Sequence, residues 1–177
     1  FGKSTKVYNL NLESAQFGEI TCDNGCEIHD IILSDSGFGS MHMSNDAYIY
    51  NISLYSGATF GVLNLEEQSE LNGISITGPK ANLYNIKLNA EAFIQDITIS
   101  PDSDFNNLSL GNSAYIEKVS LSSAYFNNIT MNSNSHISSI TLSGASFNGI
   151  SMGSYANINS ISVSDGSFYN YRTNIGQ

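Results

Sequence analysis

The stretch Ala124-Tyr-Phe-Asn-Asn-Ile-Thr-Met131 returns almost unchanged as Ala145-Ser-Phe-Asn-Gly-Ile-Ser-Met152. Each copy has a small residue, a large apolar residue two positions later, and two more apolar residues three and five positions after that. The pattern runs along the whole chain, and the large residue repeats every 10 to 12 residues. A unit this short cannot bury a core alone and must stack on its neighbours.

Two apolar residues separated by one polar residue are typical of a strand with one buried face. Each copy therefore predicts two very short strands joined by a two-residue corner such as Asn106-Asn107, where we expect left-handed backbone angles. Aromatic residues occupy the large position in alternate copies, every 21 to 23 residues except where leucine replaces one: Phe17, Phe38, Phe60, Leu83, Phe105, Phe126, Phe147 and Phe168.

The predicted fold is all-β. It is a right-handed parallel β-solenoid of about eight four-sided coils of 21–23 residues, with an internal phenylalanine ladder. We expect residues 1–177 to form a single solenoid repeat domain. Neither end resembles a polar cap, and open strands favour association. Two expectations follow, a fragment of a longer solenoid or a fibre subunit that stacks end to end.

Composition excludes some classes of function. Of the 177 residues, 41% are hydrophobic and only 12% are charged, and the net charge is −10. The chain has no basic patch, so we expect no nucleic-acid partner. It also has no apolar run long enough to span a bilayer, so we expect no direct membrane insertion by this segment.

The only two cysteines are Cys22 and Cys26, and His29 follows shortly after. The repeat places both sulfur atoms on the inner side of one corner, where a disulfide is geometrically possible. Free buried thiols and a metal site that includes His29 remain open alternatives. A single close pair is typical of an exported protein.

No catalytic arrangement is visible. The acidic group Glu66, Glu67 and Glu70 fits a solvated loop better than a pair of catalytic carboxylates. His42 and His136 stand alone on outward positions. We therefore expect no enzyme, no catalytic or metal-binding residue and no cofactor.

Outward positions of alternate copies carry two ranks of hydroxyl groups. They comprise Ser75, Thr77, Thr98, Ser100, Ser120, Ser122, Thr141 and Ser143. Such ranks resemble the arrays of solenoid ice-binding proteins, although those arrays favour threonine; the alternative is that Ser and Thr simply suit exposed strands. Tyr48, Tyr50 and Tyr55 lie close together and complete the candidate binding surface.

The phrases Phe126-Asn-Asn-Ile-Thr-Met131 and Ala145-Ser-Phe-Asn-Gly-Ile150, the Asn/Ser/Gly richness and the close cysteine pair resemble the passenger repeats of vacuolating-cytotoxin-like autotransporters of the Helicobacter type. A weaker likeness is to pentapeptide-repeat solenoids, whose coils are shorter. The first resemblance implies an extracellular β-helix on the bacterial cell surface that takes part in adhesion.

The expected function is a structural, surface-exposed or secreted scaffold, such as an adhesin stalk. Its expected partner is a host-surface protein, a glycan or another copy of the chain. A self-assembling extracellular fibre and an ice-binding solenoid are the alternatives.

Overall fold

The computed structural model describes residues 1–168 and 171–173. The described part contains no helix and consists of strands joined by short turns. The strands are β1 (Lys6–Glu13), β2 (Gln16–Cys22), β3 (Glu27–Ser34), β4 (Gly37–Met43), β5 (Tyr48–Leu54), β6 (Thr59–Leu65), β7 (Glu70–Ile76), β8 (Asn82–Leu88), β9 (Phe93–Ile99), β10 (Asp104–Leu110), β11 (Tyr115–Ser122), β12 (Tyr125–Met131), β13 (His136–Ser143), β14 (Ser146–Met152), β15 (Asn157–Ser164), β16 (Ser167–Phe168) and β17 (Tyr171–Thr173).

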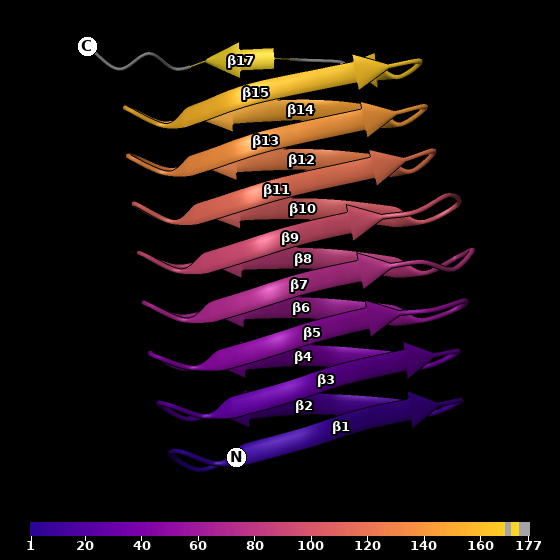
Figure 1. The fold of residues 1–177 in the computed structure, drawn as a ribbon, viewed down its shortest axis with the longest axis vertical. Helices are drawn as coiled ribbons and strands as arrows, with labels where there is room; N and C mark the ends of the chain where they lie inside the picture. Colours follow the sequence, from indigo (N-terminus) through magenta and orange to yellow (C-terminus); the bar gives the residue numbers. More distant parts are fainter. Residues whose placement is uncertain (169–170, 174–177) are drawn as a thin grey trace.

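The strands form two parallel sheets that face each other. The odd-numbered strands β1 to β15 make one sheet in sequence order, and the even-numbered strands β2 to β16 make the other, with β17 beside β14. The odd strands run in front from left to right and the even strands return behind them, while the chain rises (Figure 1). This path is a right-handed coil, and the predicted parallel β-solenoid of about eight coils is confirmed.

Each repeat copy forms one strand that bends near its middle, so the prediction of two separate short strands per copy is corrected. In β10, Phe105, Leu108 and Leu110 point inward, whereas Asn106 and Asn107 both lie on the outer side. The ladder pairing continues through Asn107 to Leu110 after this irregularity. The described coils bend at the same place, so neighbouring coils stay hydrogen-bonded across the bend. A coil therefore contains two bent strands instead of four short ones.

Left-handed residues lie mainly in the connections between strands, and not at the predicted corners. Within the bends that the structure describes, only Asn9 and Asp30 have positive φ angles. From β1 to β16, each connection instead carries one such residue directly before the small inward residue, as in Asp46 before Ala47. Many connections close with a turn hydrogen bond, for example from the amide of Ala47 to the carbonyl of Ser44 at 3.2 Å. The chain thus reverses sharply while the small side chain turns into the core.

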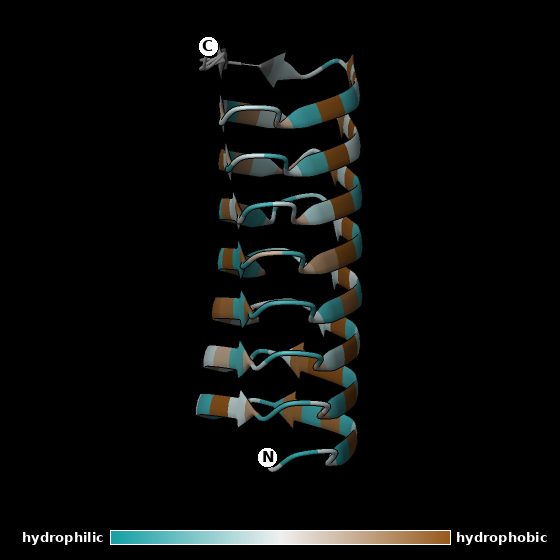
Figure 2. Ribbon diagram, turned by 90° about the vertical axis from the view of Figure 1, so that its left-hand side faces the viewer, coloured by the Kyte–Doolittle hydropathy of each residue, from teal (hydrophilic) through white to brown (hydrophobic). Residues whose placement is uncertain are grey.

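The two edges of the solenoid differ. Between β2 and β15, the turns from even to odd strands, such as residues 23–26 and 44–47, are all four residues long. Turns from odd to even strands have two residues in the outer coils but lengthen after β5, β7 and β9 to residues 55–58, 77–81 and 100–103. Figure 2 looks onto the edge of uniform turns, and hydrophobic bands recur at the same place on successive coils. The variable edge explains why the repeat grows from 21 to 23 residues in the middle.

The core is a continuous column between the two sheets. Register pairing places the predicted ladder residues from Phe17 to Phe168 on consecutive even strands. Phe105 and Phe126 stack with ring centroids 4.5 Å apart, and Phe126 meets Phe147 edge-on at 5.0 Å. These three rings are fully buried. The predicted internal ladder is confirmed from Phe38 to Phe147. Phe17 stacks on Phe38 but is 37% exposed, because no earlier even strand covers it. The side chain of Phe168 lies outside the described residues.

Four buried polar side chains sit in the small inward position: Ser36, Ser69, Ser103 and Ser135. Their hydroxyl groups donate to backbone carbonyls. Ser103 donates to Gly78 at 2.8 Å and Ser135 to Asn132 at 2.6 Å. Since a buried hydroxyl without a partner would destabilise the core, these bonds explain why serine substitutes for alanine here.

Candidate binding surfaces

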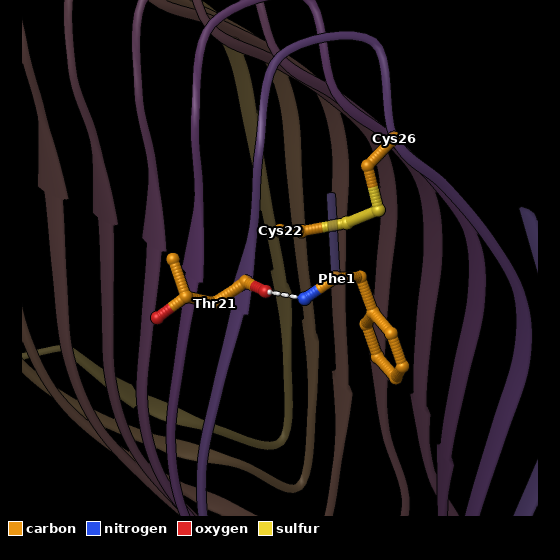
Figure 3. Close-up of a disulfide and its surroundings, with 4 residues drawn as sticks. All are labelled: Phe1, Thr21, Cys22 and Cys26. Atoms are coloured by element: carbon orange, nitrogen blue, oxygen red, sulfur yellow. Dashed lines mark hydrogen bonds between the residues drawn. A yellow bond between two sulfur atoms is a disulfide. The ribbon is translucent and has the colours of Figure 1, made fainter. Parts of the chain in front are cut away.

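The two cysteines close one of the four-residue turns. Cys22 ends β2, Cys26 precedes β3, and a disulfide joins them with their Cα atoms 5.7 Å apart. Both are fully buried. Figure 3 shows the bridge beside Phe1, whose amino group donates to the carbonyl of Thr21 at 2.6 Å.

A metal site at the cysteines does not form. His29 lies on the outer face, where its ring stacks on Tyr8 and Tyr50. Among the described residues, no group of three or more His, Cys, Asp or Glu side chains is placed to hold a metal ion.

An aromatic stack covers the outer face of the odd sheet near its first coils. The ring centroids of Tyr8 and His29 are 4.6 Å apart, and those of His29 and Tyr50 are 4.0 Å apart. Tyr48 lies beside this stack, 6.3 Å from Tyr50. A hydrogen bond to Glu70, together with partial burial, raises the pKa of Tyr48 to about 12. The predicted tyrosines Tyr48 and Tyr50 therefore belong to one cluster.

Charged groups flank this stack. Lys6 and Glu27 form an ion pair with the nitrogen and oxygen 2.9 Å apart, and Glu27 also lies 3.4 Å from His29. The hydrogen bond from Lys6 lowers the pKa of Glu27, and the same bond raises the pKa of Lys6. Tyr55 is separate from the stack, since it lies in the turn after β5 and is exposed.

A second stack on the same face was missed by sequence reasoning. Phe93, Tyr115 and His136 occupy the first position of three neighbouring odd strands, with centroids 5.3 and 5.2 Å apart. The hydroxyl of Tyr115 lies 2.7 Å from that of Ser138, which is 3.3 Å from Nε2 of His136. Aligning the copies by their outward first residue would have revealed this row.

The predicted hydroxyl ranks differ from each other in regularity. The first rank runs in register over β7, β9, β11 and β13 through Ser75, Thr98, Ser120 and Thr141. In the second rank, Ser122 and Ser143 pair within strands. Thr77 and Ser100 instead follow the ends of β7 and β9, in the longer turns. The sheet therefore carries one regular rank and one that leaves the sheet in the middle coils.

The even sheet carries ladders of asparagine. The amide of Asn107 donates to Oδ1 of Asn85 at 2.9 Å, and that of Asn128 donates to Oδ1 of Asn107 at 3.4 Å. A parallel pair joins Asn148 to Asn127 at 2.9 Å. These ladders border a hollow of about 350 Å³ over β10, β12 and β14.

Within the acidic group at the turn after β6, the carboxylate of Glu66 accepts hydrogen bonds from two asparagine side chains. Oε1 of Glu66 accepts from Asn64 at 2.9 Å, and Oε2 accepts from Asn89 at 2.7 Å. His42 lies 3.4 Å from Oε1. The cluster ties three coils together at their edge.

The chain matches no protein-family model, no curated protein and no solved structure. No described segment is a helix with the length and apolarity needed to cross a membrane. Function must therefore be inferred from the outer surface.

Proposed function

We propose that this chain is a non-enzymatic, secreted or cell-surface rod that serves as an adhesin stalk or display scaffold. The carrying observation is the unbroken register from β1 to β15, in which each coil repeats the same inward residues and leaves the outward positions free to vary. Such a rod is stiff because each coil is hydrogen-bonded to the next along its whole length.

Three further observations support this proposal. The buried disulfide fits an oxidising compartment outside the cytoplasm. The outer aromatic stacks supply amphipathic contact area of the kind that is enriched in binding surfaces. The resemblance of the repeats to autotransporter passengers points the same way.

The proposal is tested by adhesion. Beads coated with the purified chain are incubated with cultured epithelial cells, with immobilised matrix proteins and with a glycan array. We expect saturable binding to at least one of these surfaces. The variant Tyr8→Ser/Tyr50→Ser should weaken this binding, because it removes two outer rings without touching the core.

The matched control is Tyr84→Ser/Tyr125→Ser, which removes two exposed rings from the even sheet. Equal loss in both variants would contradict a specific role for the aromatic stack. Absence of binding to every surface, or hydrolysis of a polysaccharide by the wild-type chain, would overturn the proposal. Electron microscopy of the same sample separates single rods from fibres formed by self-association.

Ice binding is less well supported by the geometry. It requires a flat, regular double rank, and the turn positions of Thr77 and Ser100 break the second rank. Serine also occupies half of the regular rank. We expect no thermal hysteresis from the purified chain. Thermal hysteresis or shaping of ice crystals by the chain would instead support ice binding.

A further inference from the structure

The outer face of the odd sheet is hollowed over Gly73. The hollow has a volume of about 300 Å³ and crosses β3, β5, β7 and β9. Four strands at a spacing of about 4.8 Å span about 14 Å along the rod. Its polar walls are formed by Asp30, Asn51 and Asp96 on one side and by Ser53, Ser75 and Thr98 on the other.

The hollow exists because Gly73 has no side chain, and the fold does not require this glycine. The φ angle of Gly73 is not among the positive values of the described residues. A Cβ atom here would lie 3.6 Å from Oδ1 of Asn51 and 4.0 Å from the carbonyl of Asp96, which is ordinary contact. At Gly61, by contrast, a Cβ atom would collide with the carbonyl oxygen of Gly39. Packing explains Gly61 but leaves Gly73 unexplained.

The neighbours in the same row make the gap more informative. Register pairs Gly73 with Asn51 on β5 and with Asp96 on β9. Nδ2 of Asn51 donates to Oδ1 of Asp30 at 2.9 Å, which turns Oδ1 of Asn51 toward the hollow. The row of hydrogen-bonded side chains thus ends at Asn51, because Gly73 has no side chain to continue it. The acceptor Oδ1 of Asn51 borders the space above Gly73.

The chemistry of the walls selects the ligand class. Two carboxylates and an amide oxygen accept hydrogen bonds on one side, and three hydroxyl groups donate or accept on the other. No Lys or Arg lines the hollow, so an anion is disfavoured. Ile32 adds an apolar contact at one end, and its outward position breaks the hydroxyl rank. A ligand rich in hydroxyl groups with exposed C–H faces matches this combination.

We propose that the hollow over Gly73 is a binding subsite for a short neutral oligosaccharide that lies along the rod axis. Sugar hydroxyls would donate to Asp30, Asn51 and Asp96, and the serine and threonine hydroxyls would complete the network. The volume lies at the lower end of the range for small-molecule sites, in keeping with a shallow subsite. This inference deepens the proposed display function and rests on it only for its biological setting.

The test is a titration of the whole chain with cello-, malto-, manno- and chito-tetraose, followed by amide NMR shifts. We expect at least one of these sugars to give saturable shifts centred on Gly73, Ser75 and Thr98. The variant Gly73→Asn places a side chain inside the hollow and should weaken binding at least about tenfold, which corresponds to about 1.4 kcal/mol.

The matched control is Ser139→Asn, which adds the same side chain in the same row on β13, outside the hollow. It should bind like the wild type. Thermal melts of both variants check that the fold is intact. The inference is overturned if none of the four sugars binds at concentrations up to about 10 mM, which would place the dissociation constant at least about tenfold above 1 mM. It is also overturned if Gly73→Asn binds as well as the control. If the sugars do not bind but the chain still adheres to cells, the sugar subsite is refuted and the proposed display function is not.

Discussion

Replacing Phe126 by alanine tests the internal ladder most directly. The ring is fully buried, stacks on Phe105 at 4.5 Å and meets Phe147 at 5.0 Å. An aromatic side chain buries about 150–250 Å². At about 25 cal/mol per Å² this burial contributes about 4–6 kcal/mol. Alanine keeps part of that area, so we expect the free energy of unfolding to fall by about 3–5 kcal/mol.

Two companion variants should lower the free energy of unfolding by smaller amounts. Leu83 already fills the same ladder position on β8 and is 1% exposed. Phe126→Leu should therefore cost only about 1.5 kcal/mol or less. Tyr125→Ser changes the adjacent outward residue, which is 44% exposed. It should alter stability by no more than about 0.5 kcal/mol.

The assay is urea unfolding followed by circular dichroism, with hydrogen exchange to locate the loss. Because each coil contacts only its neighbours, protection should fall first in β10, β12 and β14. The stabilising role of the ladder would be refuted if Phe126→Ala lowered the free energy of unfolding by less than about 1 kcal/mol, or by no more than Tyr125→Ser does. Surface substitutions usually change it by about 0.5 kcal/mol or less.

Other substitutions test the outer face and the turn. Gly61→Ala should destabilise the chain by about 1–3 kcal/mol because its Cβ meets the backbone of the coil below, whereas Gly73→Ala should be near neutral; thermal melts compare the two, and equal effects would contradict the geometry. Tyr48 should titrate near its raised pKa of about 12, and Glu70→Gln should bring the pKa back toward its usual value of about 10. Because the fold favours the neutral phenol, this contribution to stability is complete below the usual pKa and is lost as the pH rises through the raised one; an ultraviolet difference titration against Tyr48→Phe measures it, and an unchanged pKa in Glu70→Gln would refute the assigned cause. Reduction of the Cys22–Cys26 disulfide opens a short loop and should cost about 2 kcal/mol, seen as a lower melting temperature with reductant.

The period of the sequence predicted the coil because inward residues are constrained by stacking. Phe105, Phe126 and Phe147 must face the same column in every coil, so their spacing survives in the sequence as a visible repeat. The bend was harder to interpret. Two successive outward residues such as Asn106 and Asn107 look the same whether the strand ends there or continues. Only backbone pairing across coils distinguishes the two cases.

The left-handed positions could not be located from residue types. Gly25 and Asn134 are typical residues for such angles, but Lys80, Glu91 and Tyr155 adopt them as well. Their place in the connection is imposed by the neighbouring coils, which fix where the chain must reverse. Tertiary pairing overrides local preference at these positions.

The candidate sites depend on alignment between coils. Tyr8, His29 and Tyr50 are 21 residues apart, so their stacking appears only after the copies are placed in register. In the sequence alone, Gly73 looks like another of the turn-forming residues that recur at the paired outward positions. Gly73 becomes informative only when Asn51 lies below it and Asp96 above it.

Outward departures from the repeat are the best guide to function in a fold of this kind. An inward substitution disturbs the column, whereas an outward one costs the fold little, so outward residues are free to serve binding. Gly73 and Ile32 both depart from their rows, and steric packing does not require the glycine. The aromatic stacks and the hollow share one face of the odd sheet but involve different rows. We therefore expect substitutions in one row to leave recognition by the other intact.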